Sequence, residues 1–228
     1  MQQRMQAGAP LAQAFLAAVG LAVIAGWVDA VAYLNLHAYV ANMTGVVVLL
    51  GLASADLDLP GVGRQALTLS GFMAGVLLSR LLRRLGWGPA PSYALSSVVV
   101  LACIGRLGGG PLAVAALALS MGLQNAASTV FGGVGLNTVF LTGNLQRLGE
   151  ALLPDLATSD SATSGTRRGF APRLLPAVVL MYAVGAAAGG LALRHLAAPL
   201  LPPGLALTAA AGIALIRARP QAACSNRL

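Results

Sequence analysis

Two short polar passages, repeated 96 to 98 residues apart, contain the residues of this chain best suited to bind a solute inside a membrane. Asp29 in the first passage corresponds to Asn125 in the second, and each is followed by a Thr-Gly pair. Such a set offers one carboxylate, which can take up a proton or coordinate a cation, and hydroxyl and amide groups that can hydrogen-bond a solute. The candidate binding residues are Asp29, Asn42, Thr44, Gly45, Gln124, Asn125, Thr142, Gly143 and Asn144.

Asp29 admits two interpretations because it follows the apolar run from Leu16 to Val28. A carboxylate at such a depth costs about 2.5–3.5 kcal/mol, so it needs a partner, water or a proton. In the functional interpretation it is a protonatable or cation-coordinating group on a transport path. In the structural interpretation it is held by a neighbouring helix end or by an arginine, and it stabilises the fold. The residue alone does not decide between them.

The two threonines each precede a glycine and an apolar stretch, so Thr44 and Thr142 are expected to be N-caps of short helices. If both short helices re-enter, their N-termini meet near the midplane, where free N–H groups favour anions or carboxylates. Asn42, Asn144, Gln124 and Asn125 would then add amide groups in the same zone. In the alternative, these side chains only satisfy backbone groups freed where the helices are interrupted.

The composition indicates an integral membrane protein. Hydrophobic residues make up 57% of the 228 residues and charged residues only 9%, whereas soluble domains are roughly a quarter charged. All 14 basic residues are arginines, and they lie at the ends of apolar runs, which is typical of membrane anchoring and argues against nucleic-acid binding. The sequence contains no Ser-His-Asp set, metal-spaced Cys/His cluster or phosphate-binding glycine loop. We therefore expect no enzyme activity, no cofactor and no bound metal.

Six stretches are long enough to cross the membrane, and the arginines indicate their orientation. With both short segments re-entering and the N-terminus in the cytoplasm, only Arg64, Arg106 and Arg194 face outward. The other arginines, including the cluster at 80–84, face the cytoplasm, together with both termini. An eight-crossing arrangement would move that cluster outside. The expected spans are 14–34, 65–83, 91–107, 111–131, 173–195 and 201–217, and the short segments are 40–53 and 137–152.

Three spans and one short segment in each copy predict two inverted-topology repeats within a single membrane domain. Repeat one covers 14–107 and repeat two covers 111–217, with the glycine run before Pro111 at their junction. The polar stretch 154–172 is expected to be a flexible cytoplasmic linker. The fold class is thus an all-α polytopic membrane protein with six transmembrane helices and two short re-entrant or broken helices.

Each repeat also carries a face of small residues, Gly71 to Gly75 and Gly185 to Gly189. Such faces allow two helix backbones to approach closely. Packing between the two repeats is one interpretation, and a homodimer seam is the alternative.

The passages Gly26-Trp-Val-Asp-Ala, Val40-Ala-Asn-Met-Thr-Gly, Gly122-Leu-Gln-Asn-Ala and Leu141-Thr-Gly-Asn-Leu resemble those of the YoaK family. The members are bacterial inner-membrane proteins defined largely as a domain of unknown function, and the resemblance covers about residues 14–217. It implies a six-span inner-membrane protein, without a substrate. The family usually reads Thr-Gly-Asn in the first short segment, where this chain has Val46.

We therefore predict a small secondary transporter or channel for a small polar or anionic solute, with proton coupling through Asp29 as a further hypothesis. The alternative is a non-transporting membrane scaffold or assembly factor. The expected partners are the bilayer and an unidentified small solute, and the expected location is the bacterial inner membrane.

Overall fold

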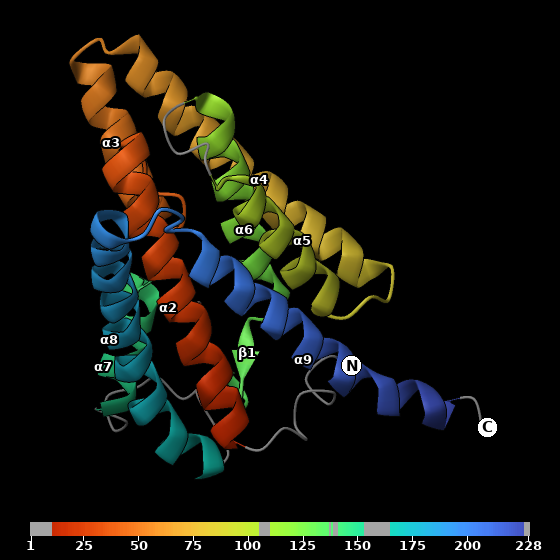
Figure 1. Ribbon diagram of the computed structural model, residues 1–228. Coiled ribbons are helices and arrows are strands. Elements are labelled where there is room, and N and C mark those ends of the chain that lie inside the picture. The colour runs from red at the N-terminus through yellow and green to blue at the C-terminus, as the bar shows by residue number, and fades with distance from the viewer. Residues whose placement is uncertain (1–10, 105–109, 137, 139–140, 153–164, 226–228) are drawn as a thin grey trace.

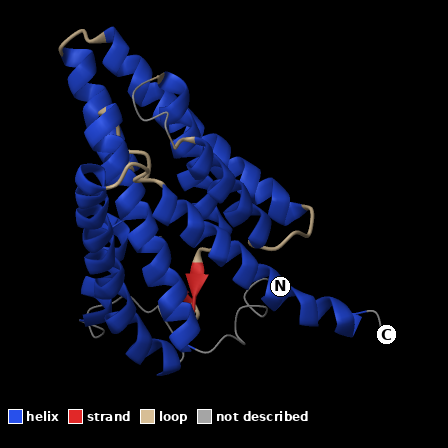
Figure 2. Cartoon of the chain, in the orientation of Figure 1, coloured by secondary structure: helices blue, strands red, loops and turns tan. Residues whose placement is uncertain are grey.

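The computed structural model describes residues 11–104, 110–136, 138, 141–152 and 165–225. Almost all of them are helical, and one small hairpin interrupts the helices (Figure 2). The hairpin pairs β1 (Val130–Phe131) with β2 (Val134–Gly135). The helices are α2 (Leu11–Leu36), α3 (Met43–Ala55), α4 (Leu59–Arg84), α5 (Ala90–Ala102), α6 (Pro111–Ala127), α7 (Leu141–Leu152), α8 (Gly165–His195) and α9 (Leu201–Ser225).

Three helical stretches in the described part of the chain are long and apolar enough to cross a membrane: Leu11–Leu36, Leu59–Arg84 and Phe170–His195. They correspond to α2, α4 and most of α8. The other predicted spans coincide with shorter apolar helices, which are Ala90–Ala102, Pro111–Ala127 and Leu201–Arg217. An all-α, membrane-type fold is thus supported.

The helices of the first half of the described chain pack against those of the second half. In Figure 1, α2 leads to α3, which continues away from the end of α2 before α4 runs back past it. In the second half, α6 runs opposite to α2, and the hairpin, α7 and α8 follow it along the chain (Figure 1). The helix pairs α2–α8 and α4–α6 make the most extensive contacts, so each half is packed against the other.

Glycines bring the backbones together in both of these pairs. A Cβ atom on Gly26 would lie 2.0 Å from the carbonyl oxygen of Tyr182, and one on Gly122 would lie 2.2 Å from that of Phe72. A Cβ on Gly185 would lie 2.1 Å from the oxygen of Val23. Only glycine fits such contacts, so small residues fix these crossings. The small-residue faces therefore pack between the two halves of the chain.

The matching contact in the other pair is that of Gly75, whose Cβ would lie 2.1 Å from the oxygen of Leu119. Gly26 and Gly122 are 96 residues apart, as are Val23 and Leu119. Gly75 and Gly185 are 110 apart, as are Phe72 and Tyr182. The contact between α6 and α4 is thus the counterpart of the contact between α2 and α8. Residues of α2 and α6 correspond at an offset of 96, and residues of α4 and α8 correspond at an offset of 110.

Buried hydroxyl groups hold α5 against its neighbours. Ser92 bonds Ser79 of α4, and Ser96 bonds Ser120 of α6 at 2.7 Å. Ser97 donates to the carbonyl oxygen of Gly204 and contacts the hydroxyl of Thr208 on α9. In an apolar surrounding each of these groups needs a partner, so the hydroxyls stabilise the packing of a helix only 13 residues long.

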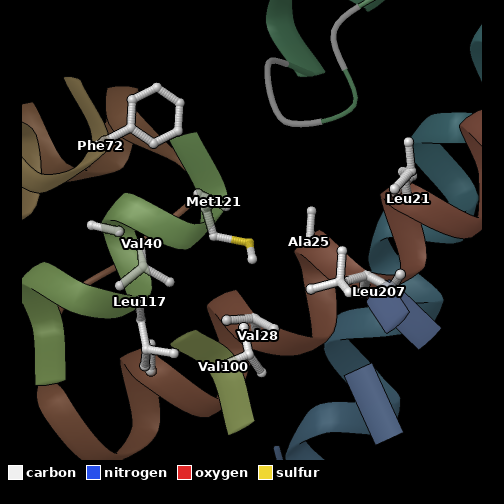
Figure 3. Close-up of a cluster of buried hydrophobic side chains, with 14 of the residues drawn as sticks. Leu21, Ala25, Val28, Val40, Phe72, Val100, Leu117, Met121 and Leu207 are labelled. Atoms are coloured by element: carbon white, nitrogen blue, oxygen red, sulfur yellow. The ribbon is translucent and has the colours of Figure 1, made fainter. Parts of the chain in front are cut away.

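A hydrophobic cluster occupies the crossing of α2 and α6. Ala25 and Val28 from α2 and Leu117 and Met121 from α6 are fully buried there (Figure 3). These side chains make this part of the crossing apolar.

The expected span 111–131 ends earlier than its hydrophobicity indicates. Helix α6 stops at Ala127, and the hairpin follows. Gly132 and Gly133 have φ values of +57° and +84°, which suit a two-residue hairpin turn and no helix.

Part of the expected linker is helical. Helix α8 begins at Gly165, and its early residue Phe170 packs edge-on against Phe15 of α2, with ring centres 6.5 Å apart. This contact packs the early part of α8 against α2. Residues 154–164 of the expected linker lie outside those described.

Candidate functional site at the two helix breaks

The carboxylate of Asp29 binds the chain at the break between α2 and α3. Its Oδ1 accepts hydrogen bonds from the backbone N–H groups of Val40 and Ala41, at 2.6 and 2.8 Å. Its Oδ2 accepts one from the N–H of Asn42 at 3.2 Å and one from the hydroxyl of Tyr182 at 2.5 Å. Asp29 is 3% exposed, so four donors compensate a carboxylate that is almost completely removed from solvent.

The helical period explains why Asp29 meets Tyr182. Gly26 lies against the backbone of Tyr182, and Asp29, three residues further along α2, lies on the same face. The left-handed conformation of His37, with φ of +53°, ends α2 and turns the chain so that residues 40–42 return toward Asp29. The carboxylate is thus held by a neighbouring helix end, as the structural interpretation requires.

The N-cap of α3 is Asn42, not Thr44. The Asn42 side chain accepts a hydrogen bond from the N–H of Gly45, and α3 begins at Met43. Thr44 lies one residue inside the helix and is exposed. The helix begins earlier than predicted because Asp29 fixes the residues before it.

Further polar groups surround this first break. The ring of Tyr33 stacks on Tyr39 with centres 4.5 Å apart. The amide nitrogen of Gln65 on α4 donates to the carbonyl oxygen of His37 at 3.2 Å. Gln65 thereby satisfies a carbonyl group freed at the end of α2.

The second break, after α6, is organised differently. Gln124 is fully buried and donates from Nε2 to the carbonyl oxygen of Leu21 at 2.9 Å. Asn125 is 6% exposed, and Arg83 reaches the last carbonyl oxygen of α6, that of Ala127, at 3.3 Å. Nearby, the hydroxyl of Tyr93 donates to Ser128 at 2.9 Å.

Helix α7 carries the remaining predicted site residues. Thr142 and Gly143, in its first turn, are exposed, whereas Asn144 is buried. Val46 corresponds to Asn144 and is also fully buried. The family usually has an asparagine at the position of Val46. The first half of this chain therefore has a buried apolar side chain where the second half has a buried amide.

The two breaks form separate clusters. The bond from Gln124 to Leu21 places the end of α6 beside a residue eight positions before Asp29. Leu21 lies roughly 12 Å before Asp29 along α2, at 1.5 Å per residue. Of the candidate residues, Thr44, Thr142 and Gly143 are exposed, whereas Asp29, Gln124, Asn125 and Asn144 are buried. Within the described residues, no group of three or more His, Cys, Asp or Glu could hold a metal ion.

Sequence reasoning missed Tyr182, Arg83 and the serines of α5. The available signal was a polar side chain in an otherwise apolar run, which requires a partner. The partner of Tyr182 lies 153 residues away, so no local pattern identifies it.

The cap assignment makes a direct prediction. Asn42→Ala removes the bond to Gly45 and is expected to lower the unfolding free energy by about 1 kcal/mol. Thr44→Ala, at an exposed position, is the control and should change it by less than about 0.5 kcal/mol. Reversible unfolding in detergent micelles measures both, and a larger effect at Thr44 would restore Thr44 as the cap.

Comparison with known proteins agrees with the membrane architecture. The chain is 33% identical over 140 residues to the UPF0700 transmembrane protein YoaK of Bacillus subtilis (strain 168), covering 56% of this chain and 62% of that protein. The chain thus matches less than two thirds of that relative's length. No solved structure matches it. The family model described as "Protein of unknown function (DUF1275)" matches residues 17–213, and the chain belongs to this family of membrane proteins.

Proposed function

We propose that this protein is a small secondary transporter or channel for a small polar solute, built from two inverted halves. The observation that carries this proposal is that each half contains an interrupted helix, α2–α3 or α6–α7, with buried polar side chains at the interruption. Membrane proteins tolerate irregular backbone at depth where it is enclosed by protein or lines a cavity, and broken helices often bind transported solutes.

The inverted relation is supported by the packing. The contacts of Gly26 and Gly185 between α2 and α8 have counterparts in those of Gly122 and Gly75 between α6 and α4. The first helices of the two halves run in opposite directions (Figure 1). In a transporter with inverted repeats, one repeat moves against the other, so that the site opens first to one side of the membrane and then to the other. Matched interfaces between the two halves suit such a movement.

The orientation in the bacterial inner membrane follows from the arginines. With both termini in the cytoplasm, the turn between α3 and α4 faces outward and the arginines at the end of α4 face inward. This orientation is part of the proposal.

The alternative is a membrane scaffold that transports nothing. Two observations favour it: the apolar, fully buried crossing of α2 and α6, and the carboxylate of Asp29 with four hydrogen-bond donors. A carboxylate with four hydrogen-bond donors stabilises one conformation of the helices around it. Proton transfer through Asp29 would require some of these hydrogen bonds to break.

Flux across liposomes containing the purified full chain distinguishes the two functions. A transporter or channel raises the entry of at least one small solute above that of protein-free liposomes. If Asp29 couples protons, Asp29→Asn abolishes the pH dependence of this flux, because an amide of similar shape cannot release a proton. Asp56→Asn, which makes the same change at an exposed carboxylate, is the control and retains the pH dependence. Flux equal to protein-free liposomes for every charged and neutral solute tested would contradict transport and favour the scaffold.

A further inference from the structure

One exposed face of α4 changes from apolar to basic in the last turns of the helix. Met73, Leu77 and Leu81 lie on this face, and each is more than half exposed. Arg80 and Arg84 continue the same face, because residues three and four apart are neighbours on a helix surface, and both are exposed. The turn that follows, from α4 into α5, lies at the edge of the molecule (Figure 1). This face therefore places two cations at the end of an apolar stripe.

The described residues offer these two arginines no counter-charge. Asp56 and Asp58 lie before the other end of α4, about 39 Å away at 1.5 Å per residue. Glu150 lies on α7, which packs on α8, and Asp29 already has four hydrogen-bond donors. Uncompensated arginines next to an apolar helix surface attract anions at the membrane surface.

The third arginine of this cluster has a different role. Arg83 is half-buried and donates to the carbonyl oxygen of Ala127 at 3.3 Å, so its charge is directed at the carbonyl end of α6. No hydrogen bond within the described residues occupies the guanidinium group of Arg80 or of Arg84. These two side chains are therefore available to a molecule outside the chain.

The equivalent helix of the second half lacks the cluster. At the offset of 110, Arg84 corresponds to Arg194, which is exposed in the last turn of α8. Arg80 corresponds to Gly190, and Arg83 corresponds to Leu193. One arginine is thus present where α4 has three. In the inverted arrangement proposed above, the cluster lies on one side of the membrane only.

The shape and charge of this face select the class of ligand. A guanidinium group binds a phosphate through two parallel hydrogen bonds. A free anion would satisfy the arginines but would leave the apolar stripe beside them uncovered. A zwitterionic lipid would bring a cation close to the second arginine. A lipid with a phosphate and no positive group satisfies both parts of the face.

We propose that Arg80 and Arg84 bind the phosphate of an anionic phospholipid of the phosphatidylglycerol type, whose acyl chains lie along Met73, Leu77 and Leu81. Arg83 is a positioning residue that holds the end of α4 against α6. This inference goes beyond the proposed function and applies to a transporter and to a scaffold alike, because it does not depend on a solute.

Trp87, an exposed residue three positions after Arg84, reports on lipid at this place. Its fluorescence is quenched by bromine atoms on a neighbouring acyl chain. The full chain is reconstituted in vesicles of phosphatidylcholine and phosphatidylglycerol, with one lipid or the other brominated near the headgroup end of its chains. The difference between wild type and Trp87→Phe gives the signal of Trp87, because Trp27 is common to both. Brominated phosphatidylglycerol is expected to quench Trp87 at a lower mole fraction than brominated phosphatidylcholine, by about fivefold for each arginine at low ionic strength.

Matched variants assign this preference to the arginines. Arg80→Gln combined with Arg84→Gln is expected to abolish it. Quenching by brominated phosphatidylcholine should stay unchanged in this double variant, which shows that the end of α4 still faces lipid. Arg194→Gln makes the same change at the single equivalent arginine of α8 and leaves the preference intact. High salt lowers the preference in wild type, because it screens exposed charges.

Each other outcome overturns the lipid site. Equal quenching of Trp87 by the two brominated lipids in wild type would mean that the arginines select no lipid. A preference that the double variant retains would place its cause elsewhere. Competition by inorganic phosphate would assign the arginines to a free anion, and absence of quenching by either lipid would place Trp87 away from the bilayer.

Discussion

Replacing Asp29 with leucine is expected to lower the unfolding free energy by about 3–5 kcal/mol, because several buried donors lose their acceptor at about 1–3 kcal/mol each. Leucine resembles aspartate in shape but accepts no hydrogen bond. The N–H groups of Val40, Ala41 and Asn42 and the hydroxyl of Tyr182 would then remain buried without an acceptor. Reversible unfolding in detergent micelles measures the loss.

A graded series identifies the cause. Asp29→Asn keeps one acceptor oxygen and should cost about 2 kcal/mol, and Tyr182→Phe, which removes one donor, about 1–2 kcal/mol. Because both changes act on the same carboxylate, the double variant should lose less than the sum of the two. Asp56→Leu changes an exposed carboxylate and should stay within about 0.5 kcal/mol of wild type.

Combining stability with flux decides the role of Asp29. A large loss of stability with pH dependence of the flux retained in Asp29→Asn would assign the carboxylate to the fold. Unchanged stability with altered pH dependence would contradict the structural role and support proton coupling.

The sequence predicts the helices and the importance of Asp29 better than it predicts contacts. Periodic apolar runs identify most helices because burial or lipid contact is a local requirement. A carboxylate after thirteen apolar residues identifies a buried partnered group for the same reason. The identity of the partners is not local, because the donors come from residues 40–42 and 182.

Helix ends are predicted less well because single interactions decide them. Thr44 and Asn42 are both good N-caps, and Asp29 fixes the chain so that Asn42 is used. The hairpin after Ala127 depends on Gly132 and Gly133 adopting positive φ, which an apolar pattern does not encode. The repeat itself is visible because duplicated residues keep their types, but the difference between Tyr182 and Phe72 gains meaning only once their equivalent positions are known.

The glycine faces illustrate a similar limit. Their spacing predicts close packing but leaves open whether the partner is the other half or a second chain. The contacts of Gly75 with Leu119 and of Gly185 with Val23 identify the other half. The same kind of contact leads to the second prediction with a large expected effect on stability.

Gly26→Ala is expected to destabilise the protein by about 3 kcal/mol, at the upper end for overpacking, because the new Cβ would lie 2.0 Å from the carbonyl oxygen of Tyr182. Relief requires α2 and α8 to separate, which also weakens the bond from Tyr182 to Asp29. Gly122→Ala should have a similar effect, since its Cβ would lie 2.2 Å from the oxygen of Phe72. Both are measured as the change in unfolding free energy in micelles.

The same helix provides the matched control. A Cβ on Gly20 would have no neighbouring atom within 4 Å, so Gly20→Ala should be neutral or stabilise α2 by up to about 1 kcal/mol through helix propensity. Equal effects at Gly20 and Gly26 would mean that helix propensity, and not contact between the halves, determines both. A loss at Gly26 without one at Gly122 would contradict equivalent packing of the two halves. Comparable losses at both would support the matched interfaces on which the transport proposal depends.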